Sequence, residues 1–282
     1  MRISLIVDIV RNEEKLLAEE IKKRAIGLEV LNVSQEPLEL GRKVMDVEFA
    51  IIRTISMFRS LYSSAILEGQ GIRTINNSKA INLCNDKILA YIELQKNDIK
   101  IPRTIIAFSQ DSTLKAYKTI GFPLVDKPPI GSWGRLVSLI RDSIEGKAII
   151  EHRELMNSSQ LKVHIVQEYV NKVNRDIRCI VIGEDLLGCY ARNSPKDDWR
   201  SNIALGGFPS KIEVDEELAK IAIKASKVLG VEFSGVDILE HEEKGYLVNE
   251  VNSTPEFKGF MSALNINVAE ALVNYIIEKI KK

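Results

Sequence analysis

The amino-acid sequence predicts an α/β (α+β) fold in three lobes. A chain of 282 residues is near the length at which one hydrophobic core divides into several. Early in the chain, short apolar runs alternate with stretches of helical spacing, which is typical of a parallel sheet covered by helices. From residue 163 onward, strand patterns dominate. We therefore predict an N-terminal parallel α/β lobe, a small central α+β lobe and a C-terminal antiparallel, β-rich lobe.

The N-terminal lobe is predicted to span residues 1–85. It opens with an apolar run at 2–8 that is typical of a buried strand. A stretch of helical spacing follows at 12–26, and Gly27 stands where a helix would end. The same reasoning predicts, in chain order, strands at 28–33 and 47–53, a helix at 57–68 and a strand at 72–75.

The central lobe is predicted over residues 86–165 and the C-terminal lobe over 166–282. Asn85 or Asp86 is expected to cap the first central helix. The stretch 131–135 contains glycine and follows two prolines, which predicts a loop. The remaining expected helices lie at 85–97, 112–120, 213–229 and 268–281. The remaining expected strands lie at 103–107, 122–127, 163–168, 176–183, 186–193, 232–241 and 245–252.

Composition and charge argue against several classes of protein. Thirty-nine basic side chains balance thirty-nine acidic ones, so no chain-wide field for nucleic acid is expected. No apolar run reaches the ~18 residues of a membrane-spanning helix, so no membrane span is expected. The cysteines, Cys84, Cys179 and Cys189, are odd in number and lack CxxC spacing. This predicts a reducing, cytoplasmic location, no structural zinc, and cysteines that serve as small core residues.

The strongest chemical signal lies in residues 233–255. Two strand patterns flank a turn at 242–245, which predicts a hairpin. In that hairpin His241 pairs with Tyr246, Asp237 faces Glu250, and Asn252 shares the face of Glu250. Two carboxylates and an amide carbonyl are hard oxygen ligands of the kind that Mg²⁺ prefers. An exposed polar sheet face is the alternative, but the surrounding apolar residues and the facing like charges favour a bound cation.

Three further features suit anionic groups. Lys127 ends a predicted strand before a small-residue loop, which can cradle phosphate, although a plain strand–helix connection explains it equally well. Lys87 lies in the first turn of a helix, where a phosphate partner would offset the unfavourable helix dipole; a solvated lysine is the simpler interpretation. Arg192, Arg200 and Asn202 could hold a carboxylate or phosphate, although a solvated loop has the same composition.

At this point the chain resembles the ATP-grasp ligases of the RimK/LysX family. Members of this group add glutamate to ribosomal protein S6 or act, as the LysX and ArgX types, on an amino-group carrier protein. The segments QEYVNKVNRDIRCIVIGEDLLGCYAR, WRSNIALGG and EVNSTPEFKGF match in order and spacing, and the similarity covers essentially the whole chain. The resemblance implies an ATP-grasp fold, and it is strongest to the ArgX type.

The resemblance also implies an ATP and metal site. Lys87 and Lys127 would contact the phosphates, and Asp237, Glu250 and Asn252 would hold two Mg²⁺ ions. The loop over the phosphates would comprise Gly131, Ser132, Trp133, Gly134, Arg135 and Leu136. Adenine contacts would come from Gln167, Glu168 and Val170, and the ribose contact from Asp176. Asn202, also counted with the ATP site, would bind the phosphorylated carboxylate or the incoming amino acid.

Substrate-binding residues follow from the same resemblance. Arg192 and Arg200 would be catalytic, holding the phosphorylated carboxylate or the incoming amino acid. The other implied substrate residues are Ile203, Ala204, Glu256, Lys258, Gly259 and Phe260. The Gly259-Phe260 pair resembles the ArgX type, whereas LysX members tend to carry Asn-Thr or Asn-Ser there. A bulky Phe260 would shorten the pocket to fit glutamate rather than α-aminoadipate.

The implied reaction is carboxylate–amine ligation through an acyl phosphate. The γ-carboxylate of the C-terminal glutamate of LysW, a small acidic carrier protein, would be phosphorylated and then captured by the α-amine of glutamate. This would serve arginine (ornithine) biosynthesis. The alternatives are an α-aminoadipate–LysW ligase of lysine biosynthesis, a glutamate ligase of the ribosomal protein S6 type, and a non-catalytic ATP-binding scaffold. Dimers or tetramers are common in the family, and the sequence gives no independent sign of a homo-oligomer.

Overall fold

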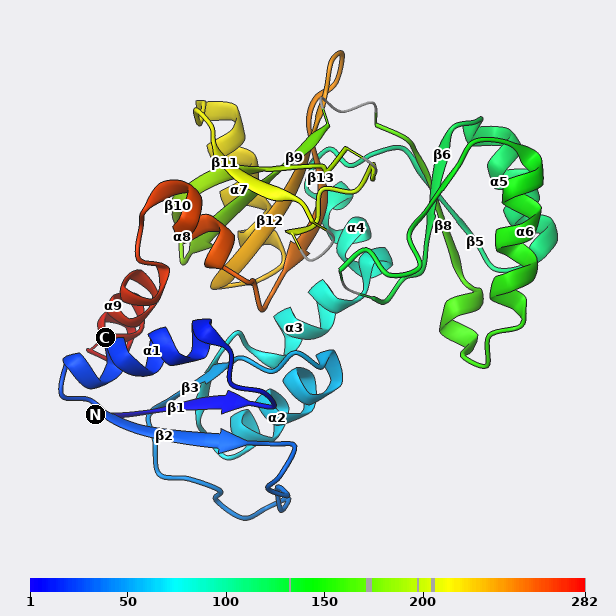
Figure 1. Cartoon of the computed structure of the whole chain (residues 1–282). Coiled ribbons are helices and arrows are strands. Elements are labelled where there is room, and N and C mark those ends of the chain that lie inside the picture. The colour runs from blue at the N-terminus through cyan, green and yellow to red at the C-terminus, as the bar shows by residue number, and fades with distance from the viewer. Residues whose placement is uncertain (132, 171–173, 197, 204–205, 282) are drawn as a thin grey trace.

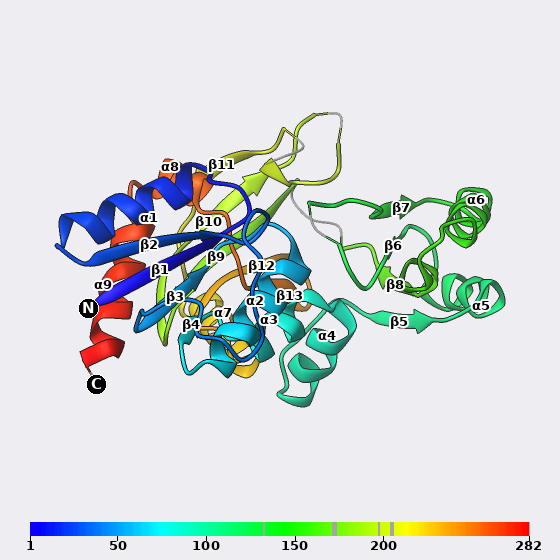
Figure 2. The same cartoon turned by 90° about the horizontal axis from the view of Figure 1, so that it is seen from below.

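The computed structural model describes residues 1–131, 133–170, 174–196, 198–203 and 206–281. Figures 1 and 2 show three lobes, with the N-terminal lobe beneath the C-terminal lobe and the central lobe to one side. Each lobe is built on its own sheet, and their strand orders are β2-β1-β3-β4, β5-β8-β6-β7 and β11-β10-β9-β12-β13. The predicted division into one parallel and one antiparallel, β-rich lobe around a smaller lobe is confirmed.

The N-terminal lobe is a parallel sheet, as predicted. Strand β1 pairs in parallel with β2 on one side and with β3 on the other. The chain therefore leaves β1 and β3 at the same edge, at the point where the strand order reverses, which is where open parallel sheets bind ligands. Its elements are β1 (Arg2–Val7), α1 (Asn12–Lys23), β2 (Gly27–Asn32), β3 (Phe49–Ile52), α2 (Met57–Gly69), β4 (Arg73–Ile75) and α3 (Ser78–Asn85).

Helix α3 is absent from the sequence prediction. It is short, and its cap is local, because the Asn77 side chain accepts a hydrogen bond from the amide of Ala80. A second cap follows directly: Asp86 accepts from the amides of Ile88 and Leu89 and begins α4 (Lys87–Lys96). Of the two caps that the sequence leaves open, Asn85 and Asp86, the structure therefore has Asp86. Lys87 is the first residue of the helix.

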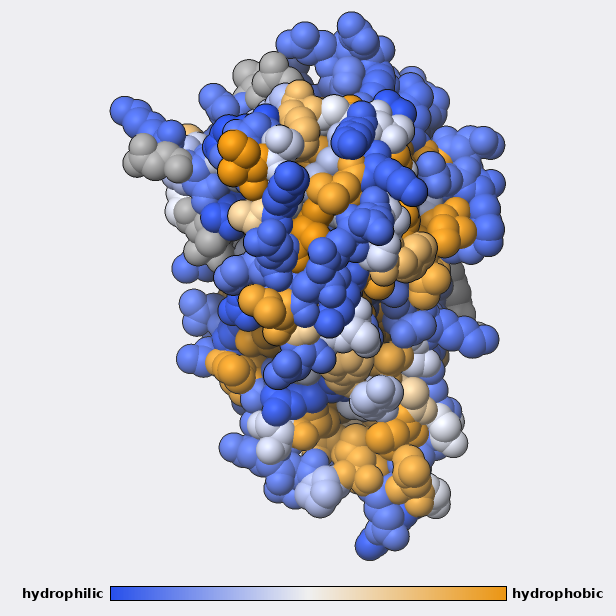
Figure 3. Space-filling model, turned by 90° about the vertical axis from the view of Figure 1, so that its right-hand side faces the viewer, coloured by the Kyte–Doolittle hydropathy of each residue, from blue (hydrophilic) through white to orange (hydrophobic). Residues whose placement is uncertain are grey.

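The central lobe is an antiparallel sheet covered on one face by two helices, α5 and α6 (Figure 1). Its elements are β5 (Thr104–Ala107), α5 (Gln110–Ile120), β6 (Leu124–Lys127), β7 (Ser138–Ile140), α6 (Ser143–Glu154), the 3-10 helix η1 (Ser159–Lys162) and β8 (His164–Glu168). Strand β7 and helix α6 are not predicted from the sequence. The expected boundary at 165/166 falls inside β8, which pairs with both β5 and β6. Figure 3 views the molecule from this lobe's side, where hydrophilic residues predominate and apolar ones lie between them.

The C-terminal lobe is a five-stranded sheet with helices on both faces. Its strands are β9 (Arg175–Ile182), β10 (Asp185–Asn193), β11 (Phe208–Lys211), β12 (Phe233–His241) and β13 (Gly245–Asn252). One face packs against α4 and α7 (Glu216–Val228). The other packs against α8 (Lys258–Leu264) and α9 (Val268–Lys281). Strand β11 and helix α8 are not predicted from the sequence.

The N-terminal and C-terminal lobes share one hydrophobic core. Ile3 and Leu5 of β1 belong to the same buried cluster as Ile180 of β9, Phe257 and Leu272. Helix α9 lies beside α1, which brings the two ends of the chain to the same lobe (Figure 1). Among the described residues, no single helix has the length and apolarity to cross a membrane, although α8 and α9 would pass together and bend by 109°.

The cysteines correct one part of the sequence prediction. All three are buried, as expected of core residues. Cys179 and Cys189, however, face each other on β9 and β10 and form a disulfide, which leaves Cys84 as a free thiol. An odd number of cysteines does not exclude a pair, because antiparallel register can place two distant positions opposite each other. The argument for a reducing compartment from the cysteine count is therefore wrong.

Candidate active site

The predicted carboxylate cluster forms, although the hairpin that carries it differs from the predicted one. Its turn is tighter than expected, because His241 pairs with Gly245 rather than with Tyr246. A β-bulge at Asn249 restores the register, so that Asp237 lies opposite Glu250 as predicted. Asp237, Glu250 and Asn252 line one cavity. The turn is one residue shorter than predicted and the bulge adds one residue, so the predicted pairing is restored at Asp237 and Glu250.

Asp237 is buried between two arginines. Arg178 of β9 makes a two-pronged ion pair with it, and Nη2 of Arg192 lies 2.9 Å from its Oδ2. Burial alone would raise the pKa of Asp237, but the two guanidinium groups outweigh burial and hold the pKa below its ordinary value. Asp237 is therefore an anion in a strongly cationic setting, which suits a site that must also hold phosphate oxygens.

The other two oxygen donors are less engaged. Glu250 is a quarter exposed and lies 3.4 Å from the Lys87 ammonium. Asn252 donates its amide N–H to the Gly235 carbonyl at 3.3 Å, which leaves its own carbonyl oxygen for a ligand. Among the described residues, no group of three or more His, Cys, Asp or Glu side chains is placed to hold a metal by itself. Two carboxylates and one amide fit Mg²⁺, which takes few protein ligands and completes its shell with water and phosphate.

Both predicted lysines reach this cluster. Lys87 donates to the Gly131 carbonyl at 2.7 Å, and Lys127 donates to the Asn249 side chain at 3.0 Å and lies over the Tyr91 ring. Burial lowers the pKa of Lys127 to about 8, despite nearby carboxylates that raise it. Two cations and the bulge residue Asn249 therefore converge from different lobes on the metal-type oxygens.

The predicted phosphate loop is a loop in the structure and faces a smaller cavity, which Asp237 and Glu250 also line. Gly131, Trp133, Gly134 and Arg135 line it, whereas Leu136 does not and is partly exposed. Arg200 donates to the Gly134 carbonyl at 3.3 Å and is held by Asp198 at 2.8 Å. Arg200 thereby joins the loop of the central lobe to the C-terminal lobe. Ser132 and Ala204, two further predicted residues, lie outside the described part of the chain.

The expected adenine segment lines the end of this cavity. Gln167, Glu168 and Val170 all contribute to its wall, with Val170 almost fully buried. The carboxylate of Glu168 is held by Lys244 and by the amide of Arg103. The segment thus leads from the last strand of the central sheet along the wall of the cavity.

Asp176 has protein partners of its own. Arg192 donates twice to its carboxylate, at 2.7 and 2.9 Å, and the Ser201 hydroxyl donates to it as well. Arg192 therefore bridges Asp176 and Asp237, the predicted ribose and metal residues. Asp176 and Arg192 line the smaller cavity, and the expected contact of Asp176 with ribose remains a prediction.

The larger cavity, which Asn252 also lines, continues from the metal-type cluster towards the N-terminal lobe. Arg192, Asn202, Asp237 and Glu250 line both cavities, so the two are parts of one continuous space. The predicted substrate residues Ile203, Glu256, Lys258 and Gly259 line the second cavity. This continuous space therefore extends from the central lobe to the N-terminal lobe.

Phe260 is not part of the cavity wall. It is fully buried in the core, where its ring packs edge-on against Tyr190 and close to Gly188. The structure therefore does not support the expectation that Phe260 shortens the pocket by direct contact. Phe260 does, however, pack against Tyr190, which lines the cavity.

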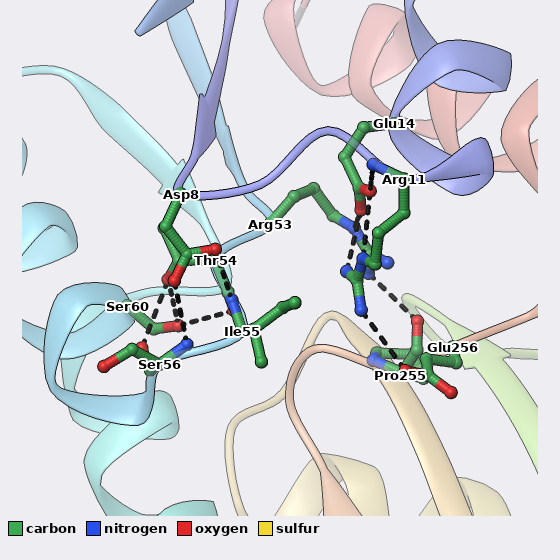
Figure 4. Close-up of polar contacts among 10 residues, drawn as sticks. All are labelled: Asp8, Arg11, Glu14, Arg53, Thr54, Ile55, Ser56, Ser60, Pro255 and Glu256. Carbon is green, nitrogen blue, oxygen red and sulfur yellow. Dashed lines mark hydrogen bonds and ion pairs between the residues drawn. The ribbon is translucent and has the colours of Figure 1, made fainter. Parts of the chain in front are cut away.

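The N-terminal lobe supplies a part of the site that the sequence analysis does not predict. Figure 4 shows the crevice at the carboxyl ends of β1 and β3. Arg11 pairs with Glu14 at 2.8 Å and reaches Glu256 at 3.3 Å. The fully buried Arg53 pairs with Glu14 at 3.0 Å and donates to the Pro255 carbonyl at 3.0 Å. These contacts fix residues 255–256, which follow the metal-type ligand Asn252, against the first lobe.

Other missed residues differ in how visible they are from sequence. Arg178 interrupts the apolar residues 177–182 of the strand RDIRCIVI, and that interruption is a usable signal of an inward-facing charge. Asn249 depends on a bulge, and Tyr190 reads as an ordinary strand residue, so neither has a local signal. Arg11 and Glu13 lie more than 200 residues before the hairpin, and only the fold brings them to the same cavity.

The comparisons with known proteins agree with this geometry. Residues 84–276 match the RimK-like ATP-grasp domain, and residues 3–83 match the LysX preATP-grasp domain. The chain is 60% identical to the glutamate–LysW ligase ArgX of Sulfolobus acidocaldarius, over 98% of each protein. It is 34% identical to the α-aminoadipate–LysW ligase LysX of Sulfurisphaera tokodaii, over the whole of both. A RimK domain ATP-grasp protein of Sphaerobacter thermophilus has the same fold, with a TM-score of 0.83 and 23% identity over 98% of this chain and 99% of that one.

Proposed function

Because the chain belongs to the RimK-like ATP-grasp family, an ADP-forming ligase family, we propose that it joins the α-amine of glutamate to a LysW carrier protein. The acceptor is the γ-carboxylate of the carrier's C-terminal glutamate, and the product belongs to arginine (ornithine) biosynthesis. The higher identity to the ArgX relative than to the LysX relative supports glutamate as the amino acid. We place the reaction in the cytoplasm, where ATP and the amino acid are available.

One observation carries the proposal: basic side chains, which suit phosphate oxygens, and carboxylates, which suit a metal ion, meet in one continuous cavity. These side chains come from separate lobes. Lys87, Lys127 and Arg192 face Asp237 and Glu250 at the point where the two cavities join. Such an arrangement binds a triphosphate on one side and a carboxylate on the other. Catalysis then consists of positioning and charge stabilisation.

In the first step, a carboxylate oxygen of the carrier attacks the γ-phosphorus of ATP and ADP leaves. Lys87 and Lys127 stabilise the negative charge on the phosphates, and Arg192 holds the reacting carboxylate in line. Mg²⁺ bound by Asp237, Glu250 and Asn252, two ions per site in our proposal, would neutralise the phosphate oxygens. The loop at 131–136 excludes water, which would otherwise hydrolyse the acyl phosphate.

In the second step, the amine nitrogen attacks the acyl carbon and inorganic phosphate leaves. The nitrogen loses its proton as the isopeptide bond forms. Arg192 and Arg200 are the cations that face the leaving phosphate from the C-terminal lobe. The required near-attack geometry explains why the amino-acid and carrier sites must open into the same space as the phosphate site.

The direct test is ADP release by the purified protein with MgATP, carrier and one amino acid at a time. Glutamate should support turnover, and the carrier's mass should rise by one glutamate residue. Faster turnover with α-aminoadipate would reassign the substrate, and activity towards a ribosomal protein tail instead of the carrier would reassign the acceptor. Nucleotide binding without ADP release under every condition would favour the scaffold alternative.

The metal assignment is best tested at Glu250. Glu250→Gln should lower turnover at least ~100-fold, because even the outer-shell partners of a metal contribute ~10–100-fold. Asp237→Ala is a weaker test, since it leaves Arg178 and Arg192 buried without their partner and destabilises the fold. Glu184→Gln is the matched control, because Glu184 is exposed and pairs with Lys227 on the surface. Turnover of Glu250→Gln equal to that of the control would contradict the assignment.

A further inference from the structure

Glu13 is a buried carboxylate in the larger cavity. It lies in the first turn of α1, is only 7% exposed, and lines the end of the cavity formed by the N-terminal lobe. Arg11 and Arg53 act on it electrostatically. Even so, across the described residues no hydrogen-bond donor or ion-pair partner reaches its oxygens.

The other buried carboxylates of the same helix are fully paired. Glu14 accepts from Arg11 and Arg53, and Glu20 accepts from Lys23, Arg24 and the Asn267 amide. The contrast matters because a buried charge without hydrogen bonds costs free energy, and folded proteins pair such groups. The unpaired oxygens of Glu13 also remain open to the cavity and are not sealed within protein.

The surroundings of Glu13 narrow the choice of ligand. The cavity continues from Glu13 past Glu256 to the metal-type residues Asp237 and Glu250. A carboxylate acceptor there suits an N–H donor, and a positively charged or polarised N–H gives the stronger bond. An anionic group placed directly against the unpaired Glu13 carboxylate would be repelled by it.

We propose that Glu13 is a substrate-binding residue that accepts hydrogen bonds from an N–H group of a substrate. The inference rests on the proposed function, whose substrates offer two such groups. One is the protonated amine of the free amino acid before it reacts, and the other is the backbone amide of the carrier's C-terminal residue. Both place Glu13 in recognition of the reacting partners, in a lobe that contributes none of the predicted site residues.

The test compares the full-length wild type with Glu13→Gln, Glu13→Asp and the control Glu20→Gln. Steady-state kinetics give KM for the amino acid, for the carrier and for MgATP, and glutarate serves as a competitive analogue of glutamate without the amine. Loss of a charge-assisted hydrogen bond predicts a rise of ~10–100-fold in one KM for Glu13→Gln. Glu13→Asp should fall between that variant and the wild type.

The affected constant identifies the group that Glu13 binds. A rise in KM for glutamate with an unchanged inhibition constant for glutarate assigns the amine. A rise in KM for the carrier, with the glutamate and glutarate constants unchanged, assigns the tail amide. In both cases KM for MgATP and the melting temperature stay at wild-type values, whereas Glu20→Gln lowers the melting temperature and leaves every KM unchanged.

Three results would overturn the inference. Unchanged constants in Glu13→Gln would show that its carboxylate binds no substrate. A parallel rise in all constants, or a melting temperature below that of Glu20→Gln, would give Glu13 a structural role. A wild type that turns over neither amino acid would overturn the proposed function itself, whereas a wild type that prefers α-aminoadipate would move the same test to that amino acid.

Discussion

Lys127 combines full burial with a position beside the metal-type oxygens. Burial lowers its pKa to about 8, and the charges of Glu250 and Asp237 offset only part of that effect. A lysine with such a pKa is mostly protonated at neutral pH and loses its charge within the mildly alkaline range. Because a neutral amine attracts phosphate far less than an ammonium does, the charge of Lys127 should set how nucleotide capture depends on pH.

We therefore expect kcat/KM for MgATP to fall as pH rises through about 8, the pKa of Lys127 in the free enzyme. The activity falls with rising pH because the neutral, deprotonated form of Lys127 is the inactive one. Lys127→Arg keeps its charge throughout this range, so its profile should stay flat there even if its absolute activity is lower. Profiles measured between neutral pH and pH 10 decide the matter, and the same alkaline fall in both proteins would assign the titration to another group.

Gly259 limits the width of the substrate cavity. A Cβ at this position would lie 2.6 Å from Cδ1 of Ile203 and 3.0 Å from the Tyr190 hydroxyl. Since Ile203 and Tyr190 line the cavity, any larger residue must displace one of them and so change the shape of the cavity wall.

Gly259→Ala should thus raise KM for the amino acid, by ~10-fold on the scale at which one methylene group is discriminated. KM for MgATP should not change, because Gly259 does not line the cavity that we propose for the nucleotide. Gly69→Ala is the control, since no atom lies within 4 Å of the added Cβ. An unchanged amino-acid KM would show that the substrate does not approach Gly259. Exchange of Phe260 for Thr is a poorer test of specificity, because it empties a buried site at a cost of several kcal/mol.

At the scale of elements, sequence reasoning succeeds where periodicity is long and fails where structure depends on pairing. Helix α9 follows its predicted range because four turns of apolar spacing define it. Strands β7 and β11 have only three and four residues, too few for a period, and exist through their partners β6 and β10. The hairpin shows the same limit: the sequence indicates that Asp237 faces Glu250, but not the bulge at Asn249 that makes it so.

The disulfide between β9 and β10 is a pairing feature of the same kind, and it has a measurable consequence. It closes a loop with a sequence separation of 10, for which the chain-entropy estimate is ~2–3 kcal/mol of stability. Reductant should lower the melting temperature of the wild type and leave a Cys179→Ala/Cys189→Ala variant unaffected. Thiol titration of the oxidised, denatured wild type should detect Cys84 alone. Three reactive thiols and a reductant-independent transition would contradict the pairing.

A disulfide does not by itself exclude the proposed cytoplasmic location. Intracellular proteins of hyperthermophiles contain disulfides, unlike most proteins of reducing cytosols. The abundance of Lys, Glu and Arg in this chain also leans towards a thermophilic origin. The disulfide and the charged composition both bear on the stability of the fold, and neither changes the chemistry of the cavity.

At the scale of the whole molecule, the site is an assembly of three lobes. The hairpin residues can be anticipated from the sequence because Asp237, Glu250 and Asn252 are close together along it. Arg53 cannot, because its contact with Pro255 depends on the shared core that packs the first lobe against the last. The resemblance to a ligase family supplies roles for the central and C-terminal lobes, and the contribution of the first lobe comes only from the structure.

The placement of the tryptophans makes this assembly observable in solution. The chain contains two, Trp133 and Trp199, and both line the nucleotide cavity from opposite lobes. Arg135 lies over the Trp133 ring, and Trp199 packs edge-on against Tyr169.

Nucleotide entering between the lobes must change the surroundings of both rings, so intrinsic fluorescence should shift in intensity or wavelength on titration with MgADP or a non-hydrolysable ATP analogue. Trp133→Phe and Trp199→Phe should each retain part of the signal and thereby report one lobe separately. A nucleotide that raises the melting temperature by binding, yet leaves the wild-type spectrum unchanged, would mean that it binds away from the junction of the central and C-terminal lobes.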